Sequence, residues 1–77
     1  MATPLETFRA TIAAIDARIT AVEALKTQTV DAALENVAHD LVSPRFGEDV
    51  GRAFESEINW LRFKRDQESI AYARSVL

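Results

Sequence analysis

The chain has no cysteine, so it cannot form disulfide bonds or bind a metal through thiolates. Only two glycines and two prolines occur in 77 residues, which leaves few positions where the backbone is forced to turn. His39 is the single histidine, and it supplies the only imidazole for acid–base chemistry or metal binding. No stretch reaches the roughly 18 consecutive apolar residues of a membrane-spanning helix.

A secretory signal is also missing, because no basic start is followed by an apolar segment and a small-residue cleavage site. We therefore expect no membrane segment and a location in the cytoplasm of a bacterium or of a host cell. The net charge is −3, from 9 basic and 12 acidic residues. Duplex-binding domains are usually basic, since phosphate contacts dominate their affinity, so this balance argues against nucleic acid as the partner.

Residues 3–26 carry the clearest pattern in the chain. Large apolar residues recur there at steps of three and four: Leu5, Phe8, Ile12, Ile15, Ile19 and Val22. This spacing places them on one side of a helix. Thr3 can cap that helix, Pro4 suits its first position and Glu6 completes a capping box, so the pattern predicts a helix over residues 3–26.

The other side of this predicted helix carries small residues where a surface helix usually presents charges. Its members are Ala10, Ala13, Ala14, Ala17, Ala21 and Ala24, with Thr7 and Thr20. Alanine has the highest helix propensity, so one interpretation is a stable, partly exposed helix. The other is that this alanine face lets a second subunit or a foreign helix approach closely, which makes the six alanines candidate partner-binding residues.

The large-residue side also fits three coiled-coil heptads, in which Arg18 would face Glu23 of a parallel partner helix. Three heptads are few for an autonomous coiled coil, and the rest of the chain can cover this side instead. We expect the intramolecular arrangement, which leaves the alanine face for association.

A second helix is expected over residues 30–42, with Thr29 as its cap. Its apolar positions are Val30, Leu34, Val37 and Leu41. No glycine or proline forces a stop before it, so a continuous helix that bends here is the alternative. Ser43-Pro44 ends the helix, because a residue before proline avoids the α region, and Phe46 in the following loop is expected to plug the end of the core.

A third helix is expected from Gly47 or Glu48, where Asp49 favours a helix start. One apolar stripe covers Val50, Phe54, Ile58 and Leu61, and a shifted stripe covers Trp60, Phe63, Ile70 and Leu77. One long helix that changes partners and two helices split near residues 64–68 both fit, and the lack of glycine and proline after Arg52 favours one. The fold class is therefore all-α: a single domain over residues 1–77, either a three-helix or four-helix bundle or a helical hairpin with a long C-terminal helix.

Two groups of residues were considered as sites. Asp31, Glu35 and His39 share one side of a helix and would suit a divalent metal, but a solvated polar face explains them better because no second ligand-bearing helix is evident. The basic and aromatic cluster over residues 60–65 would suit nucleic acid or protein contact. Its candidate partner-binding residues are Trp60, Arg62, Lys64 and Arg65.

Catalytic signatures are missing. The glycines at 47 and 51 lack the Lys-Ser/Thr ending of a phosphate-binding loop, and no serine has a nucleophile context. We expect no enzyme activity, no cofactor and no metal. The expected function is protein–protein interaction, as a homodimer or a small subunit of an assembly. The alternatives are a small acidic inhibitor, of the phage or mobile-element type, that covers a nucleic-acid-handling protein, and a helical nucleic-acid-binding regulator.

Overall fold

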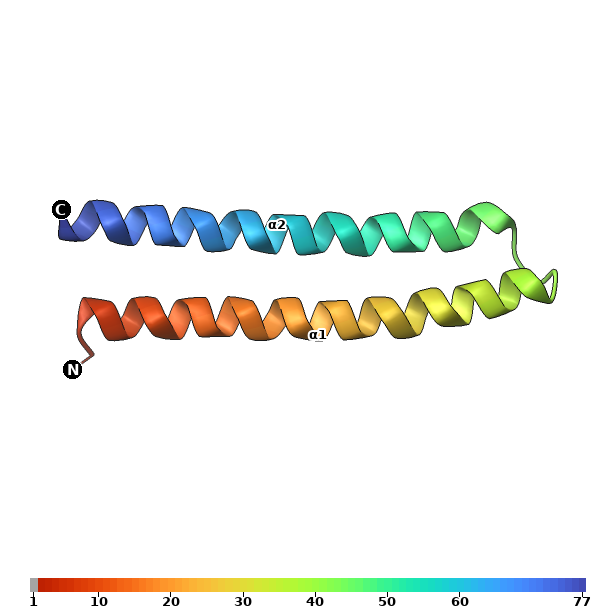
Figure 1. The fold of residues 1–77 in the computed structure, drawn as a ribbon, viewed down its shortest axis with the longest axis horizontal. Coiled ribbons are helices and arrows are strands. Elements are labelled where there is room, and N and C mark those ends of the chain that lie inside the picture. The colour runs from red at the N-terminus through yellow and green to blue at the C-terminus, as the bar shows by residue number, and fades with distance from the viewer. Residues whose placement is uncertain (1) are drawn as a thin grey trace.

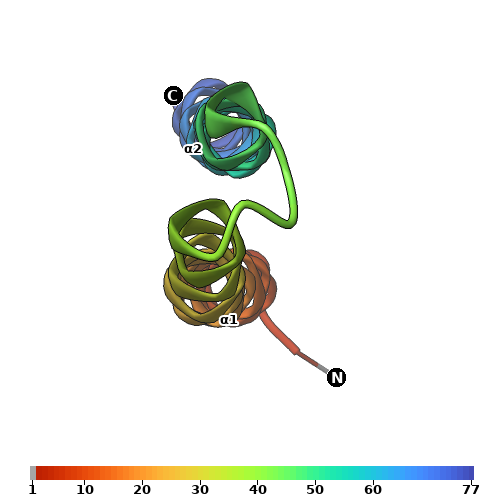
Figure 2. The ribbon, with the colours of Figure 1, turned by 90° about the vertical axis from the view of Figure 1, so that its right-hand side faces the viewer.

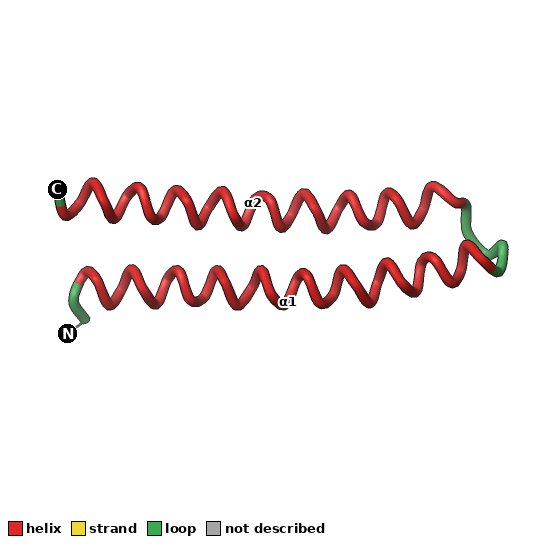
Figure 3. Tube along the Cα trace, viewed as in Figure 1, coloured by secondary structure: helices red, strands yellow, loops and turns green. Residues whose placement is uncertain are grey.

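The computed structural model describes residues 2–77 and contains two long helices. Helix α1 spans Pro4–Ala38 and helix α2 spans Pro44–Val76, and they lie side by side in opposite directions (Figure 1). The start of α1 and the end of α2 therefore lie at one end of the molecule, and a single turn joins the helices at the other end (Figure 3). No strand occurs within residues 2–77, so the all-α prediction is confirmed.

The start of α1 matches the sequence signal. Thr3 is the N-cap, with an extended backbone, and its hydroxyl oxygen accepts a hydrogen bond from the backbone N–H of Glu6 at 3.1 Å. Pro4 takes the first helical position, where a missing N–H costs nothing. This local chemistry is sufficient to fix where the helix begins.

The predicted three-helix arrangement is wrong, because α1 continues through residues 27–29 without a break. The hydroxyl of Thr27 donates to the carbonyl of Glu23 at 3.2 Å, one turn back along the same helix. A threonine bonded in this way stays inside a helix, whereas a capping threonine bonds forward to the next turn. The continuous helix and the hairpin, which the sequence left as alternatives, are the arrangement that forms.

Helix α1 ends at Ala38, four residues before the predicted end. His39 is its C-cap, and Asp40 follows in the left-handed region with φ 56°. The N–H of Asp40 donates to the Val37 carbonyl at 3.0 Å, and the N–H of Leu41 donates to the Asn36 carbonyl at 2.9 Å. This pair of bonds is the Schellman arrangement, in which glycine is the usual left-handed residue. No glycine marks this position in the sequence, because an aspartate occupies it.

Helix α2 begins at Pro44, earlier than the predicted Gly47 or Glu48. Ser43 is its N-cap, and the N–H of Phe46 donates to the Ser43 carbonyl at 3.0 Å. The helix then runs unbroken to Val76, so the prediction of one C-terminal helix is confirmed and the split near residues 64–68 does not occur. Phe46 lies in the first turn of α2 with 45 % of its surface exposed, so it does not plug the core as predicted.

The core is a seam between the two helices. In α1 the covered positions are Phe8, Thr11, Ile12, Ile15, Asp16, Ile19, Val22, Lys26, Thr29, Val30, Ala33 and Val37. In α2 they are Gly47, Val50, Gly51, Phe54, Ile58, Leu61, Glu68 and Tyr72. From Phe8 to Val22 the large-residue side of α1 is therefore covered by the chain's own second helix, as expected, whereas Leu5 stays 39 % exposed. The seam also extends along the whole of α1, past the polar residues where the predicted helix was thought to end.

Both ends of the seam have a specific contact. The rings of Phe8 and Tyr72 stack with centroids 4.4 Å apart and planes 8° from parallel. At the turn, Gly47 is buried against Leu34, and a Cβ at that glycine would lie 3.3 Å from the leucine side chain. The absence of a side chain at Gly47 thus allows the first turn of α2 to lie close to α1.

Viewed along its axis, the molecule is a single layer of two helices (Figure 2). Its extents are 57 × 20 × 10 Å and its radius of gyration is 17.6 Å, against about 11.5 Å for a compact domain of this length. The accessible surface is 5870 Å², whereas a compact protein of 8.6 kDa exposes about 4,700 Å². Only Ile15, Ala33, Ile58 and Leu61 are buried apolar residues in the described chain. The hairpin therefore has a thin core and a large exposed surface.

Candidate functional site

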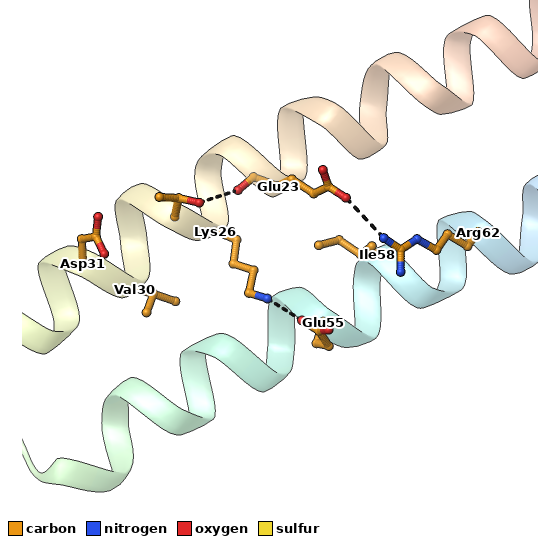
Figure 4. A pocket seen from close by; sticks show the side chains of 8 residues that line it. Glu23, Lys26, Val30, Asp31, Glu55, Ile58 and Arg62 are labelled. Atoms are coloured by element: carbon orange, nitrogen blue, oxygen red, sulfur yellow. Dashed lines mark hydrogen bonds and ion pairs between the residues drawn. The ribbon is translucent and has the colours of Figure 1, made fainter.

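One edge of the seam is a groove lined by charged residues. Lys26 Nζ lies 2.5 Å from Glu55 Oε2, and the Arg62 guanidinium lies 3.4 Å from Glu23 Oε1 (Figure 4). Figure 4 shows both pairs reaching across from one helix to the other, one on each side of Ile58. The groove has a volume of about 410 Å³. The pairs fix how the two helices face each other, because each joins residues at least 29 positions apart in the sequence.

The charged groups of this groove are tied to one another. The hydrogen bond from Lys26, with the positive charge of that ammonium, lowers the pKa of the Glu55 carboxyl, and Arg62 adds to the effect. A carboxylate with a lowered pKa is a weaker base, so Glu55 is poorly suited to accept a proton from a substrate. No histidine, cysteine or serine lines the groove. The arrangement therefore links the two helices across this edge of the seam.

A third pair between the helices explains the break in the apolar stripe of α2. Arg65 Nε lies 2.9 Å from Asp16 Oδ1. Arg65 and the half-buried Glu68 continue the seam by the same three- and four-residue steps that lead from Leu61 to Tyr72. The apolar stripe of α2 therefore does not shift to another side of the helix. It is interrupted by charged residues, and α1 provides Asp16 opposite Arg65.

The basic and aromatic cluster of residues 60–65 is divided between two sides of α2. Leu61 is buried in the seam, while Trp60 and Phe63 remain 54 % and 59 % exposed. The three bases each lie near a carboxylate of the same chain: Arg62 near Glu23, Arg65 near Asp16, and Lys64 near Glu68 at 4.0 Å. The Lys64 ammonium also lies 5.8 Å from the centre of the Trp60 ring, within reach of a cation–π contact. The exposed surface of the cluster therefore consists mainly of the Trp60 and Phe63 rings, because the positive charges lie near carboxylates of the same chain.

The alanine face of α1 lies away from α2. All six residues of this face are exposed: Ala10, Ala13, Ala14, Ala17, Ala21 and Ala24. In the single chain no side chain of α2 covers them, so they present a smooth and weakly apolar surface. As partner-binding residues they stay a prediction.

Asp31, Glu35 and His39 lie near the end of α1, and His39 forms its C-cap. Within residues 2–77 no group of three or more His, Cys, Asp or Glu side chains is placed to hold a metal ion. Neither α1 nor α2 contains a stretch that is apolar enough over the required length to cross a membrane.

Sequence reasoning missed the contribution of the polar seam residues. The ion pairs Lys26–Glu55 and Asp16–Arg65 lie at seam positions or beside them. The sequence-based prediction instead ends the apolar side of the first helix before Lys26 and the first apolar stripe of the C-terminal helix before Arg65. The missed signal was the continued alternation of three- and four-residue steps through Lys26, Thr29 and Ala33 in α1. Extending the pattern through polar residues would have indicated one long helix.

No protein-family model matches the chain, and no curated protein and no solved structure shows significant similarity to it.

Proposed function

We propose that the protein is a non-enzymatic protein–protein interaction module that works in an assembled form, most simply as a homodimer. The observation that carries the proposal is the exposed surface. The hairpin exposes about 1,200 Å² more than a compact protein of its mass, and a standard interface buries about 800 Å² on each partner. One further contact surface would bring the exposed area of each chain close to that of a compact protein.

The thin core gives association an energetic role. A two-helix hairpin has one seam and buries no large side chain completely in residues 2–77. Small chains of this kind usually gain stability from disulfides, a metal or association, and the absence of cysteine excludes the first. Association with a second surface supplies the missing apolar burial. The candidate contact residues are the alanine face of α1 and, on α2, Trp60, Arg62, Lys64 and Arg65.

The two alternative functions have weaker support. For an acidic inhibitor, Asp16, Glu23 and Glu55 offer little free charge because they pair with basic residues of the same chain, and the support comes from acids that are unpaired within residues 2–77, such as Glu57. A nucleic-acid-binding regulator needs free bases, and those of residues 60–65 lie beside carboxylates. Both hypotheses stay predictions, and a salt-dependent mobility shift would test the second.

The test is sedimentation equilibrium combined with thermal melts followed by circular dichroism over a wide range of concentrations. We expect a mass of at least two chains and a melting temperature that rises with concentration, because mass action stabilises a folded form that associates when the unfolded form does not. An 8.6 kDa monomer with a cooperative melt that is independent of concentration would remove the basis of the proposal.

A further inference from the structure

Helix α2 carries a second apolar stripe on the side that faces away from α1. Trp60, Phe63, Gln67 and Ile70 follow one another at steps of three, four and three residues. Phe63 lies five residues after the buried Ile58, which is a rotation of about 140° around the helix, and Trp60 lies about 200° from it. Trp60, Phe63 and Ile70 are 54 %, 59 % and 45 % exposed. We call these four residues the outer stripe of α2.

We propose that the outer stripe of α2 binds the outer stripe of a second copy of this chain, with the two α2 helices antiparallel and the twofold axis between Trp60 and Phe63. This inference rests on the proposed function and adds the face, the direction and the register of the association. Trp60 then packs against the partner's Phe63, and the reverse contact follows by symmetry. Four aromatic rings form the centre of the interface, where such residues contribute most.

The charges beside the stripe fit this register. In an antiparallel pair centred at this point, Glu57 lies beside the partner's Lys64 along one edge, and Asp49 lies opposite the partner's Arg74. Each contact occurs twice, so four oppositely charged pairs lie across the interface, in which Asp49 also lies near Arg52 and Lys64 near Glu68 of the same chain. A parallel, in-register pair would instead set Arg74 beside the partner's Arg74 and Asp49 beside the partner's Asp49. The charge pattern therefore favours the antiparallel direction.

The length of α2 and the exposed area of its outer stripe agree with an antiparallel pair centred between Trp60 and Phe63. Helix α2 spans Pro44–Val76, so its midpoint lies at residue 60 and an axis between residues 60 and 63 lets the two helices overlap over almost their whole length. The outer stripe presents two aromatic residues, each of which can bury roughly 150–250 Å². Alanine side chains of the α1 face are much smaller, which is why we assign the second copy to α2. Dimerisation through the alanine face is an outcome that the tests can reveal.

Cysteine cross-linking tests the geometry, and the natural chain has no cysteine to interfere. In the proposed register Ser56 lies opposite the partner's Gln67, and both residues are exposed in the single hairpin. Mixing the Ser56→Cys protein with the Gln67→Cys protein under mild oxidation should give a disulfide-linked heterodimer. Either protein alone should not cross-link efficiently, because identical positions are about 16 Å apart along the antiparallel axis.

Two outcomes of this experiment would overturn the inference. Efficient cross-linking of Gln67→Cys alone would show a parallel pair. The absence of cross-linking in the mixture, while the unmodified protein sediments as a dimer, would show that another face forms the interface and would leave the proposed function intact. A wild-type protein that is monomeric at every concentration would refute both.

Glutamate substitutions test whether the outer stripe of α2 or the alanine face of α1 forms the dimer interface. Phe63→Glu should weaken the dimer at least a hundredfold in sedimentation, because it sets two charges against the aromatic centre. Ala17→Glu introduces the same residue on the exposed face of α1 and should leave the dimer unchanged. The opposite result, with loss of the dimer only in Ala17→Glu, would assign the interface to the alanine face and overturn the inference.

Charge exchange gives a milder test that keeps the apolar stripe intact. Glu57→Lys should weaken the dimer about tenfold at low salt, since two attractive pairs become repulsive. Adding Lys64→Glu in the same chain should restore most of the affinity, because the two pairs are then re-formed with reversed charges. Failure of the double variant to recover any affinity would contradict the register.

Discussion

The inner and outer faces of α2 carry apolar residues at the same spacing but meet different surroundings. On the inner face, Ile58 and Leu61 are 4 % and 3 % exposed against α1. On the outer face, Trp60 and Phe63 remain more than half exposed. Both stripes are interrupted, since charged residues occupy two inner positions between Leu61 and Tyr72 and the polar Gln67 lies within the outer stripe.

This difference shows that the spacing of apolar residues does not by itself decide which face a hairpin buries. On the inner face, Arg65 lies 2.9 Å from Asp16 of α1. The outer stripe has no other helix of the described chain to pack against. The intramolecular seam forms where the two helices match each other in charge as well as in apolar residues. The outer stripe of α2 has no such match in α1 and stays available for association.

The largest effect is expected from a charge in the seam. Ile15→Asp should destabilise the hairpin by about 3 kcal/mol or more, because it removes a buried side chain and leaves an unpaired carboxylate in its place. A hairpin with four buried apolar residues should then lose its helical circular dichroism signal. The neighbouring and exposed Ala14→Asp is the matched control, with a much smaller loss. Wild-type melting of Ile15→Asp would refute the assignment of the seam.

Alanine substitutions of Tyr72 and Phe63 compare the contributions of the inner and outer faces of α2 to stability. Tyr72→Ala removes the stack on Phe8 at the inner face and should cost about 1–2 kcal/mol of stability at any protein concentration. Phe63→Ala on the outer face should leave the unfolding of the dilute protein almost unchanged and lower stability only at high concentration. Chemical denaturation at two concentrations measures both. Equal losses for the two variants in dilute protein would show that the outer face is also part of the monomer core.

A smaller gain in stability is expected at the turn, where neither face is involved. Asp40 adopts φ 56°, which strains a side chain, and its charge lies at the unfavourable C-terminal end of α1. Asp40→Gly should therefore stabilise the hairpin by about 1 kcal/mol without changing the dimer affinity measured for the outer stripe. Asp40→Asn removes only the charge and should gain less. A thermal melt of Asp40→Gly at or below the wild-type temperature would contradict the role given to this turn.

The smallest effect concerns pH and the edge of the inner seam. Lys26 lowers the pKa of Glu55 in the folded chain, so the ionised form contributes stability above the ordinary carboxyl range, and that contribution is lost as the pH falls through the folded pKa. Between about pH 5 and pH 3, wild-type stability should fall more than that of Glu55→Gln. Denaturation midpoints across this range provide the measurement.

Glu57→Gln is the matched control for the pH experiment, since Glu57 forms no ion pair within residues 2–77. In dilute protein this variant should keep the wild-type dependence on pH. If Glu55→Gln also follows the wild-type curve, the ion pair with Lys26 does not contribute to the stability of the inner seam.

Much of the local structure was predictable. The cap at Thr3 and the proline at the first turn defined the start of α1, and Ser43-Pro44 marked the boundary between the two helices. The end of α1 was misplaced because Asp40, and not glycine, takes the left-handed position. The charge pairs across the seam were not predictable, since each depends on two helices that are distant in sequence and lie beside one another only after folding.

By itself, the sequence determined that the chain is helical, where α1 starts, and that α1 has a large-residue side and a small-residue side. These properties depend on hydrogen bonds and side chains within a few residues of each other. The tertiary structure decided that residues 26–30 continue a helix and that the interrupted stripe of α2 faces inward. The reason is that both depend on the opposite helix, where Glu55 and Asp16 lie within ion-pair distance of Lys26 and Arg65 at the partly exposed edge of the seam.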